Sequence, residues 1–259
     1  HVQRAQRLAE QISGYAEEGV QDVGGWALAV EVLDPPEIIA PSPADVLDAF
    51  LGVPGYLLGE ALSTLYVIVA GFALAVAAGL LIGVAIAASR RVELMFAPLL
   101  VAFNAVPKVA LAPLLVVWMG FGSQPKVVMA LLVCFFPVVL SVAEGLTSTP
   151  VELAELARSL RTSRTRTFLR FRFPGALPQI FVGLKVAMPL AAVGAVIGEF
   201  SAGDEGLGFV IVQSGANSDT ALAFAAIALL SVISVALFSV LVVAERLLLP
   251  WVRETTSQR

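Results

Sequence analysis

The chain has 259 residues, of which 58% are hydrophobic and only 14% charged, whereas soluble domains carry about 25% charged residues. Its mean hydropathy of +0.90 excludes an ordinary soluble enzyme and favours a protein embedded in a lipid bilayer. The net charge of −4 says little by itself, because the charges are segregated along the chain. The only histidine is His1 and the only cysteine is Cys134. We therefore expect no catalytic residue, no metal site, no cofactor and no disulfide framework.

Residues 1–36 form an N-terminal segment with one short apolar run, residues 23–33. Residues 1–23 lack the apolar core of a cleavable signal peptide. The run at 23–33 contains Glu31 and is shorter than the roughly 20 apolar residues that cross a membrane. Whether it forms a first span stays open on the sequence.

Residues 39–50 predict a short helix ahead of the first long apolar stretch. Ser42 can cap it, Pro43 suits the first helical position and Asp45 completes a capping box. Four apolar residues share one side, which predicts a helix lying at the membrane surface. They are Val46, Leu47, Phe50 and Leu51.

Five long apolar stretches follow, each close to the length that a transmembrane helix requires. They are residues 61–88, 96–119, 127–146, 180–197 and 221–249. Asn104, Pro107 and Lys108 interrupt the second stretch. A broken helix at membrane depth is tolerated where it lines a cavity or is buried in protein. These three residues are therefore candidates for a translocation path, with a structural kink as the alternative.

Glycine and alanine are dense in the first and fourth stretches. Small residues let helix backbones approach closely in a membrane. We expect an all-α integral membrane protein, a bundle of five or six transmembrane helices that forms a dimer. Ala187, Ala191 and Gly194 make one small-residue face at helical spacing, and we expect this face to wall the path.

Two charged residues of the fourth stretch are further candidates. Lys185 lies between one and two turns inside it, and an intramembrane cation is a candidate contact for an anionic substrate. The alternatives are that its long stem snorkels to the inner interface or that it pairs with another residue. Glu199, at the outer end, is interpreted as an interfacial carboxylate, with a role in an outer gate as the alternative.

A basic segment, residues 149–174, separates the third and fourth stretches and carries six arginines and no lysine. Thr149 can cap a first helix, with Pro150 at its first position and Glu152 in the capping-box place. Apolar residues then recur at helical spacing. They are Leu153, Leu156, Ala157 and Leu160.

A second short helix is predicted to start at Ser163 or Thr165 and to carry Phe168 and Phe171 together. Pro174 lacks a backbone N–H and is expected to end it. The two helices would be apolar on one side and carry arginines on the other. A protruding pair of helices of this kind suits docking into a cleft of a soluble partner.

The arginines also predict the orientation of the chain. With the basic segment in the cytoplasm, all 13 arginines lie inside, provided that residues 23–33 span, as the positive-inside rule expects. The C-terminal tail, residues 251–259, is then cytoplasmic. Lys126, in a short outer turn, is the basic exception. The outer segments carry acidic residues instead: Asp34, Glu37, Asp45, Asp48, Glu60, Asp204, Glu205 and Asp219.

The spacing within the basic segment has a counterpart in a known family. Glu155-Leu-Ala157 is followed after three residues by position 161 and then, after nine intervening residues, by Phe171-Arg-Phe173-Pro174. This resembles the EAA–G–I-x-LP loop of permease subunits of bacterial ABC importers. The resemblance covers residues 36–250. The segments at 104–122 and 198–209 look like the branch that imports nitrate, sulfonates, taurine and pyrimidine-type vitamin precursors.

The resemblance implies a transmembrane domain at residues 37–250 in a bacterial inner or plasma membrane. It implies a permease homodimer, two cytoplasmic ABC ATPase subunits, an extracytoplasmic substrate-binding protein and a cytoplasmic coupling loop of two helices. The ATPase-coupling residues that it implies are Glu152, Glu155, Ala157, Arg158, Arg161, Phe171 and Pro174.

The chain departs from the family pattern at four positions, two of which, Phe171 and Phe173 in place of isoleucine and leucine, keep the apolar character. The family's glycine between the two short helices is Arg161 here, and its middle alanine is Leu156. Glycine allows positive backbone torsions that arginine resists. The turn geometry must therefore differ, or Arg161 must bear strain.

The predicted function is that of an ATP-driven importer permease for a small anionic or heterocyclic nutrient. No G-x-x-x-x-G-K-[ST] motif occurs, so we expect ATP hydrolysis in a partner chain and no enzyme here. The alternative is a secondary transporter, which usually shows internal repeats and coupling-ion carboxylates at mid-membrane. A membrane hydrolase would need a serine paired with Lys108 or Lys185. We expect the chain to contact the lipid bilayer and to bind no nucleic acid.

Overall fold

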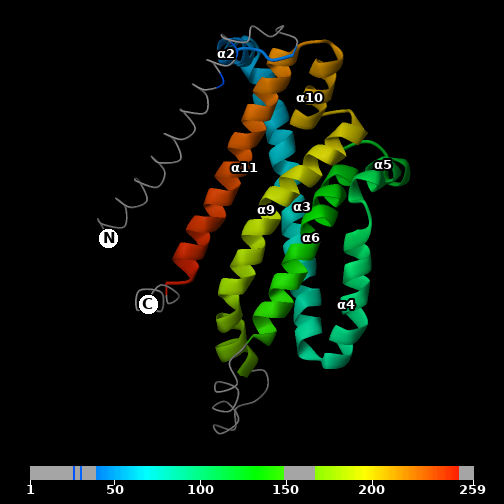
Figure 1. Ribbon diagram of the computed structural model, residues 1–259, viewed down its shortest axis with the longest axis vertical. Helices are drawn as coiled ribbons and strands as arrows, with labels where there is room; N and C mark the ends of the chain where they lie inside the picture. The colour runs from blue at the N-terminus through cyan, green and yellow to red at the C-terminus, as the bar shows by residue number, and fades with distance from the viewer. Residues whose placement is uncertain (1–25, 27–29, 31–38, 149–166, 251–259) are drawn as a thin grey trace. The chain divides into compact units, whose positions relative to one another are not determined.

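The computed structural model describes residues 26, 30, 39–148 and 167–250, and no strand occurs among them. This confirms the all-α prediction. The elements, in chain order (Figure 1), are α2 (Pro43–Gly52), α3 (Pro54–Ala88), α4 (Arg90–Ala105), a 3-10 helix (Lys108–Leu111), α5 (Ala112–Met119), α6 (Ser123–Thr147), a π-helical turn (Phe168–Arg172), α9 (Phe173–Ala202), α10 (Leu207–Ala216) and α11 (Thr220–Leu248).

Four of the described helices are long and apolar enough to cross a membrane, and they coincide with four of the five predicted stretches. They are Pro54–Ala88, Ser123–Thr147, Arg170–Ala202 and Thr220–Leu248. The remaining stretch is a pair of helices, Arg91–Ala105 and Lys108–Met119, bent by 78°. Counted as one broken span, the pair makes a fifth. The open question of a span at residues 23–33 lies outside the described residues, apart from Trp26 and Val30.

The chain divides into two compact units. One comprises His1–Gly59 and Val210–Leu229. In it, the hydroxyl of Ser42 accepts a hydrogen bond from the Asp45 N–H at 3.2 Å, and the Asp45 carboxylate accepts one from the Ser42 N–H at 2.8 Å. This confirms the capping box at the start of α2. The Ser42 hydroxyl also donates to the Asp45 carboxylate at 2.6 Å, and this hydrogen bond, together with the one from the Ser42 N–H, lowers the pKa of the Asp45 carboxyl.

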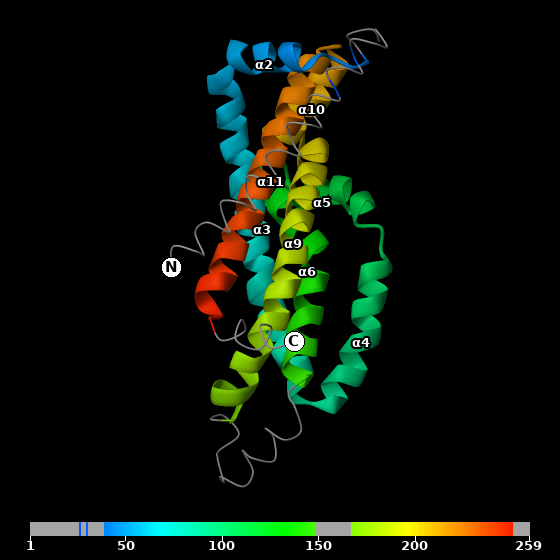
Figure 2. The same ribbon diagram turned by 60° about the vertical axis from the view of Figure 1, so that its left-hand side comes forward.

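The second unit, Glu60–Phe209 with Leu230–Arg259, is built around α6. Helix α6 lies beside α9 and also contacts α3 (Figures 1 and 2). A Cβ added to Gly194 of α9 would lie 2.7 Å from the Cα of Ala130, and one added to Gly71 of α3 would lie 2.9 Å from the carbonyl oxygen of Val127. Glycine on both flanking helices therefore brings their backbones against α6, as the density of small residues predicts.

The break between α4 and α5 follows from its sequence. Pro107 has no N–H, and Val106 before it is extended, with φ −66° and ψ 128°, as expected of a residue that precedes proline. The Lys108 ammonium group donates to the carbonyl oxygen of Asn104 at 3.3 Å and to its side-chain oxygen at 3.0 Å. The lysine thereby provides a partner for a carbonyl group that the helix end leaves free.

Pro174 does not end a helix, which corrects the predicted boundary. The π-helical turn Phe168–Arg172 runs directly into α9, and Pro174 lies in the first turn of that helix. In a regular α-helix a proline ring clashes with the carbonyl group four residues earlier. The wider π turn moves that carbonyl away, so the chain passes through Pro174 without breaking.

Candidate functional site

Most of the predicted coupling residues lie outside the described residues. Glu152, Glu155, Ala157, Arg158 and Arg161 fall within residues 149–166. The end of the basic segment is described, and there Phe171 is half-buried, as is Pro174.

The described end of the basic segment has an apolar and a basic side. Phe168 and Phe173 pack against the core, with their ring centroids 6.1 Å apart. Arg170 and Arg172 are exposed. The sequence pairs Phe168 with Phe171, whereas in the structure it contacts Phe173, because the π turn changes the spacing of residues that share a face.

Lys185 is paired inside the protein. Its ammonium group lies 2.8 Å from a carboxylate oxygen of Glu245 on α11, with about a quarter of each side chain exposed. Of the alternatives that the sequence leaves open, this geometry favours pairing. An intramembrane lysine that is matched by a carboxylate avoids the cost of an isolated charge in a membrane.

Ala191, predicted to wall the path, lies on a buried face of α9. Its side chain has no exposed surface, and it belongs to the hydrophobic core with Ala187. A Cβ on nearby Gly194 would collide with α6. Within the single chain, α6 packs against this small-residue face. Of the other candidates for the path, Asn104, Pro107 and Lys108 lie at the exposed break between α4 and α5.

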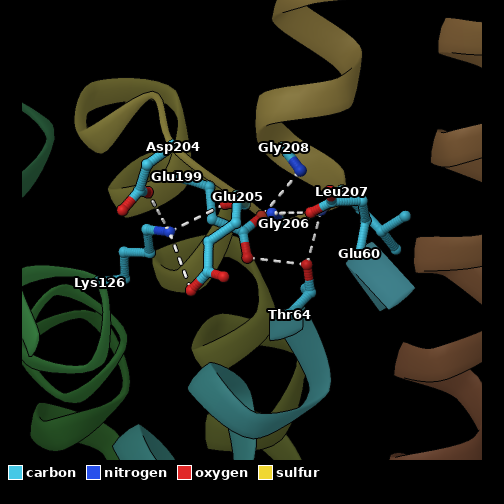
Figure 3. Close-up of polar contacts among 9 residues, drawn as sticks. All are labelled: Glu60, Thr64, Lys126, Glu199, Asp204, Glu205, Gly206, Leu207 and Gly208. Carbon is cyan, nitrogen blue, oxygen red and sulfur yellow. Dashed lines mark hydrogen bonds and ion pairs between the residues drawn. The ribbon is translucent and has the colours of Figure 1, made fainter. Parts of the chain in front are cut away.

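A buried polar cluster, absent from the sequence-based predictions, joins three helices to the turn between α9 and α10 (Figure 3). We define it as Glu60 and Thr64 of α3, Lys126 of α6, Glu199 of α9 and the turn residues 203–208. The side chains of Thr64, Lys126 and Glu199 have no exposed surface. Buried polar groups are costly unless they are paired, so their partners decide whether this arrangement is stable.

Glu199 has a partner for each carboxylate oxygen. One oxygen accepts from the Thr64 hydroxyl at 2.7 Å, and the other accepts from the Gly208 N–H at 2.7 Å. The Thr64 hydroxyl in turn accepts from the Leu207 N–H at 2.8 Å. The N–H groups in the first turn of α10 have no partner within the helix, and Glu199 and Thr64 supply one for two of them.

Lys126 of α6 and Glu60 of α3 also hold the turn. The Lys126 ammonium group lies 2.5 Å from a carboxylate oxygen of Asp204 and donates to the carbonyl oxygen of Glu205 at 2.9 Å. The Glu60 carboxylate accepts from the Gly206 N–H at 2.5 Å. Within the described part of the chain, no buried side-chain nitrogen or oxygen is left without a partner.

Three glycines make room for the cluster. Gly206 has φ +106°, and a Cβ there would overlap the Glu199 carboxylate. A Cβ on Gly208 would lie 2.8 Å from a Glu199 oxygen, and one on Gly198 would lie 2.7 Å from the Lys126 Cα. Side chains at 206 and 208 would push the turn away from the carboxylate that holds it, and a side chain at 198 would push α9 away from α6.

The distribution of charge along the sequence contains a signal for this cluster. Lys126 is the one basic residue among acidic segments on the predicted outer side, and Asp204 and Glu205 are two of those acids. Within residues 39–148 and 167–250, no group of three His, Cys, Asp or Glu residues suited to a metal ion occurs. What it can do is hold one turn against three helices.

Comparisons with known proteins identify the family. Residues 75–254 match the family described as the binding-protein-dependent transport system inner membrane component. The chain is 33% identical to the formylaminopyrimidine transport permease protein of Halalkalibacterium halodurans, over 87% of this chain and 90% of the relative. It is 37% identical to the riboflavin transport system permease protein of Chloroflexus aurantiacus, over 87% of this chain and 85% of the relative.

The fold agrees with these relationships. An inward-facing structure of the MetNI methionine ABC transporter contains a chain that is similar with a TM-score of 0.60 at 16% identity, covering 73% of this chain and 98% of that chain. The match over residues 75–254 includes the basic segment whose spacing first indicated the family. The chain therefore belongs to the binding-protein-dependent transport family, and it is a permease subunit of an ABC importer.

Proposed function

We propose that this permease couples ATP hydrolysis in two cytoplasmic ATPase subunits to import, through the segment at residues 149–174. The observation that carries the proposal is the two-sided end of that segment. Phe168 and Phe173 pack on the protein core, whereas Arg170 and Arg172 are exposed. A segment fixed to the core on one side and basic on the other can transmit movement from a docked partner to α9.

The proposed assembly contains two copies of this permease, two ATPase subunits and an extracytoplasmic binding protein in a bacterial inner or plasma membrane. Membership of the binding-protein-dependent family supports the binding protein and the ATPases. The permease itself hydrolyses no ATP. The path runs between the two copies, with Asn104, Pro107, Lys108 and Lys185 as candidate residues along it.

The proposed substrate is a small heterocyclic or anionic nutrient. Two relatives are named for formylaminopyrimidine and for riboflavin, both of which contain nitrogen heterocycles, and this favours the heterocyclic class. ATP hydrolysis by the reconstituted transporter identifies the substrate class. It is measured with a panel of pyrimidines, flavins, sulfonates, taurine and nitrate, each with the cognate binding protein, and the substrate is the compound that stimulates it.

Substitutions in the coupling segment test the assignment of the ATPase contact. Glu155→Arg and Ala157→Asp should abolish ATPase binding, or leave hydrolysis without transport, while the permease still inserts into the membrane. Co-purification with the ATPase and measurement of its turnover check both outcomes. Asp48→Asn, an exposed change on α2, serves as the control. Full ATPase association and normal transport by both variants would show that the segment is not the docking site.

A further inference from the structure

We propose that the polar cluster is a joint that stays closed during the transport cycle, so that the adjoining ends of α3, α6 and α9 move as one body. The inference rests on the proposed function for its transport cycle and goes beyond it by assigning a role to Thr64, Lys126 and Glu199. The helices that meet there are distant in sequence, since Thr64 and Glu199 are 135 residues apart.

The count of donors and acceptors explains why position 199 needs a carboxylate. Both of its oxygens accept, one from the Thr64 hydroxyl and one from the Gly208 N–H. Thr64 must give its proton to Glu199, because its own oxygen accepts from Leu207. A glutamine at 199 offers one oxygen and one NH₂ group, so one buried donor would face another donor. An unsatisfied buried donor is expensive.

Lys126 ties a third helix to the same turn. Its ammonium group is fully buried and contacts Asp204 and the Glu205 carbonyl oxygen. Neither contact is made through the lysine's own helix, so each constrains the distance between α6 and the turn. Because a buried ammonium group that loses its partners pays a desolvation cost, parting the turn from α6 is unfavourable.

The position of the cluster along the helices gives it a role in transmission. Lys126 lies in the first turn of α6, and Glu199 lies near the end of α9. The opposite ends of the same two helices, Thr147 and Phe173, flank the segment proposed to meet the ATPase (Figure 1). When α9 moves, a joint at the far end keeps the turn at 203–208 in the same position relative to α6 and α9.

Hydrogen exchange of the peptide at residues 203–209 tests the joint without knowledge of the substrate. The assembled permease and ATPase complex in nanodiscs is compared without nucleotide and with ATP plus vanadate. In wild type, exchange should be equally slow in both states. In Glu199→Gln, exchange should be about tenfold faster, the effect of one lost buried hydrogen bond. It should also differ between the two states, because the turn then follows α9 alone.

Two further variants make the result decisive. Ser141→Ala is the matched control: Ser141 is buried on α6 and its hydroxyl donates within the same helix, to the carbonyl oxygen of Val138, so exchange at 203–209 should match wild type. Thr64→Val is the second test variant if Glu199→Gln fails to fold, and it should free the Leu207 N–H. A loss merely of local structure would speed exchange equally in both nucleotide states.

Several outcomes would overturn the joint. Faster exchange in wild type with ATP and vanadate would show that the cluster opens in the cycle. Unchanged exchange in both Glu199→Gln and Thr64→Val would show that these residues do not hold the turn. If the ATPases fail to bind wild-type permease, the proposed function is wrong, and the proposed joint is wrong as well. If they bind and exchange departs from expectation, the joint alone fails.

Discussion

At the scale of single residues, the ion pair between Lys126 and Asp204 is asymmetric. The lysine side chain has no exposed surface, whereas 34% of the Asp204 side chain is exposed. Water can therefore solvate the aspartate if the lysine is removed, but it cannot reach the lysine if the aspartate is removed. The two partners should differ in what their loss costs.

We expect Asp204→Ala to destabilise the permease more than Lys126→Met. Removing the aspartate leaves the buried ammonium group only the Glu205 carbonyl oxygen at 2.9 Å and the more distant Glu205 carboxylate at 3.8 Å. A cost of about 3 kcal/mol is typical of such a loss, whereas the reverse change should cost roughly 1 kcal/mol. Thermal unfolding of the purified permease in detergent gives the order of stabilities. The double variant should recover part of the loss. Equal destabilisation by the two single changes would contradict the asymmetry.

The pair between Lys185 and Glu245 makes a second prediction at this scale. Lys185→Met should lower thermal stability by at least roughly 1 kcal/mol, because it leaves the Glu245 carboxylate without its partner at 2.8 Å. The exchange Lys185→Glu with Glu245→Lys should restore stability by reforming the pair. If the exchange restores stability but uptake remains lost, Lys185 contacts an anionic substrate in addition. Failure of the exchange to restore stability would mean that the pairing contributes nothing.

At the scale of helices, close packing makes α6 and α9 a candidate for a single moving body. Near the ends that flank the basic segment, a Cβ on Gly145 would lie 3.2 Å from the Cβ of Gln179. Disulfides usually have Cβ atoms about 3.5–4.5 Å apart, so a shift of a few tenths of an ångström would admit one.

A disulfide between Gly145→Cys and Gln179→Cys, in a Cys134→Ala background, should leave ATP-driven transport intact. The two helices keep their contact if they move together, so the added bond restrains nothing that the cycle uses. Transport is compared before and after oxidation in the same proteoliposomes, with gel mobility reporting the bond. Loss of transport on oxidation, reversed by reductant, would show that α6 and α9 slide past each other.

Much at this scale could be predicted from local sequence. The capping box of α2 and the four long spans depend on residues within a few turns of each other. The continuation through Pro174 could not be predicted, because it requires a π turn whose Phe168 and Phe173 pack on a core assembled from other helices. The partnership of Thr64 with Glu199 likewise depends on tertiary packing. Periodicity located the face that contains Ala191 but could not say which helix covers it.

At the scale of the whole molecule, the orientation in the membrane is the feature to test. With residues 147–177 cytoplasmic and residues 201–218 outside, single cysteines at the two sites should react from opposite sides. Ser163→Cys and Asn217→Cys, each with Cys134→Ala, are suitable, and Asn217 is exposed. Labelling with a membrane-impermeant maleimide in right-side-out and inverted vesicles gives the sidedness. The same sidedness for both positions would refute the predicted orientation.

The burial of Cys134 provides a natural reporter of helix separation. The thiol lies in the core with Ala75 of α3 and Ala191 of α9 and has no exposed surface. Since it is the only cysteine in the chain, alkylation of the unmodified protein can proceed only as fast as these helices part. The rate of alkylation of Cys134 therefore reports how often the helices of the bundle separate, and mass spectrometry can measure it in native membranes.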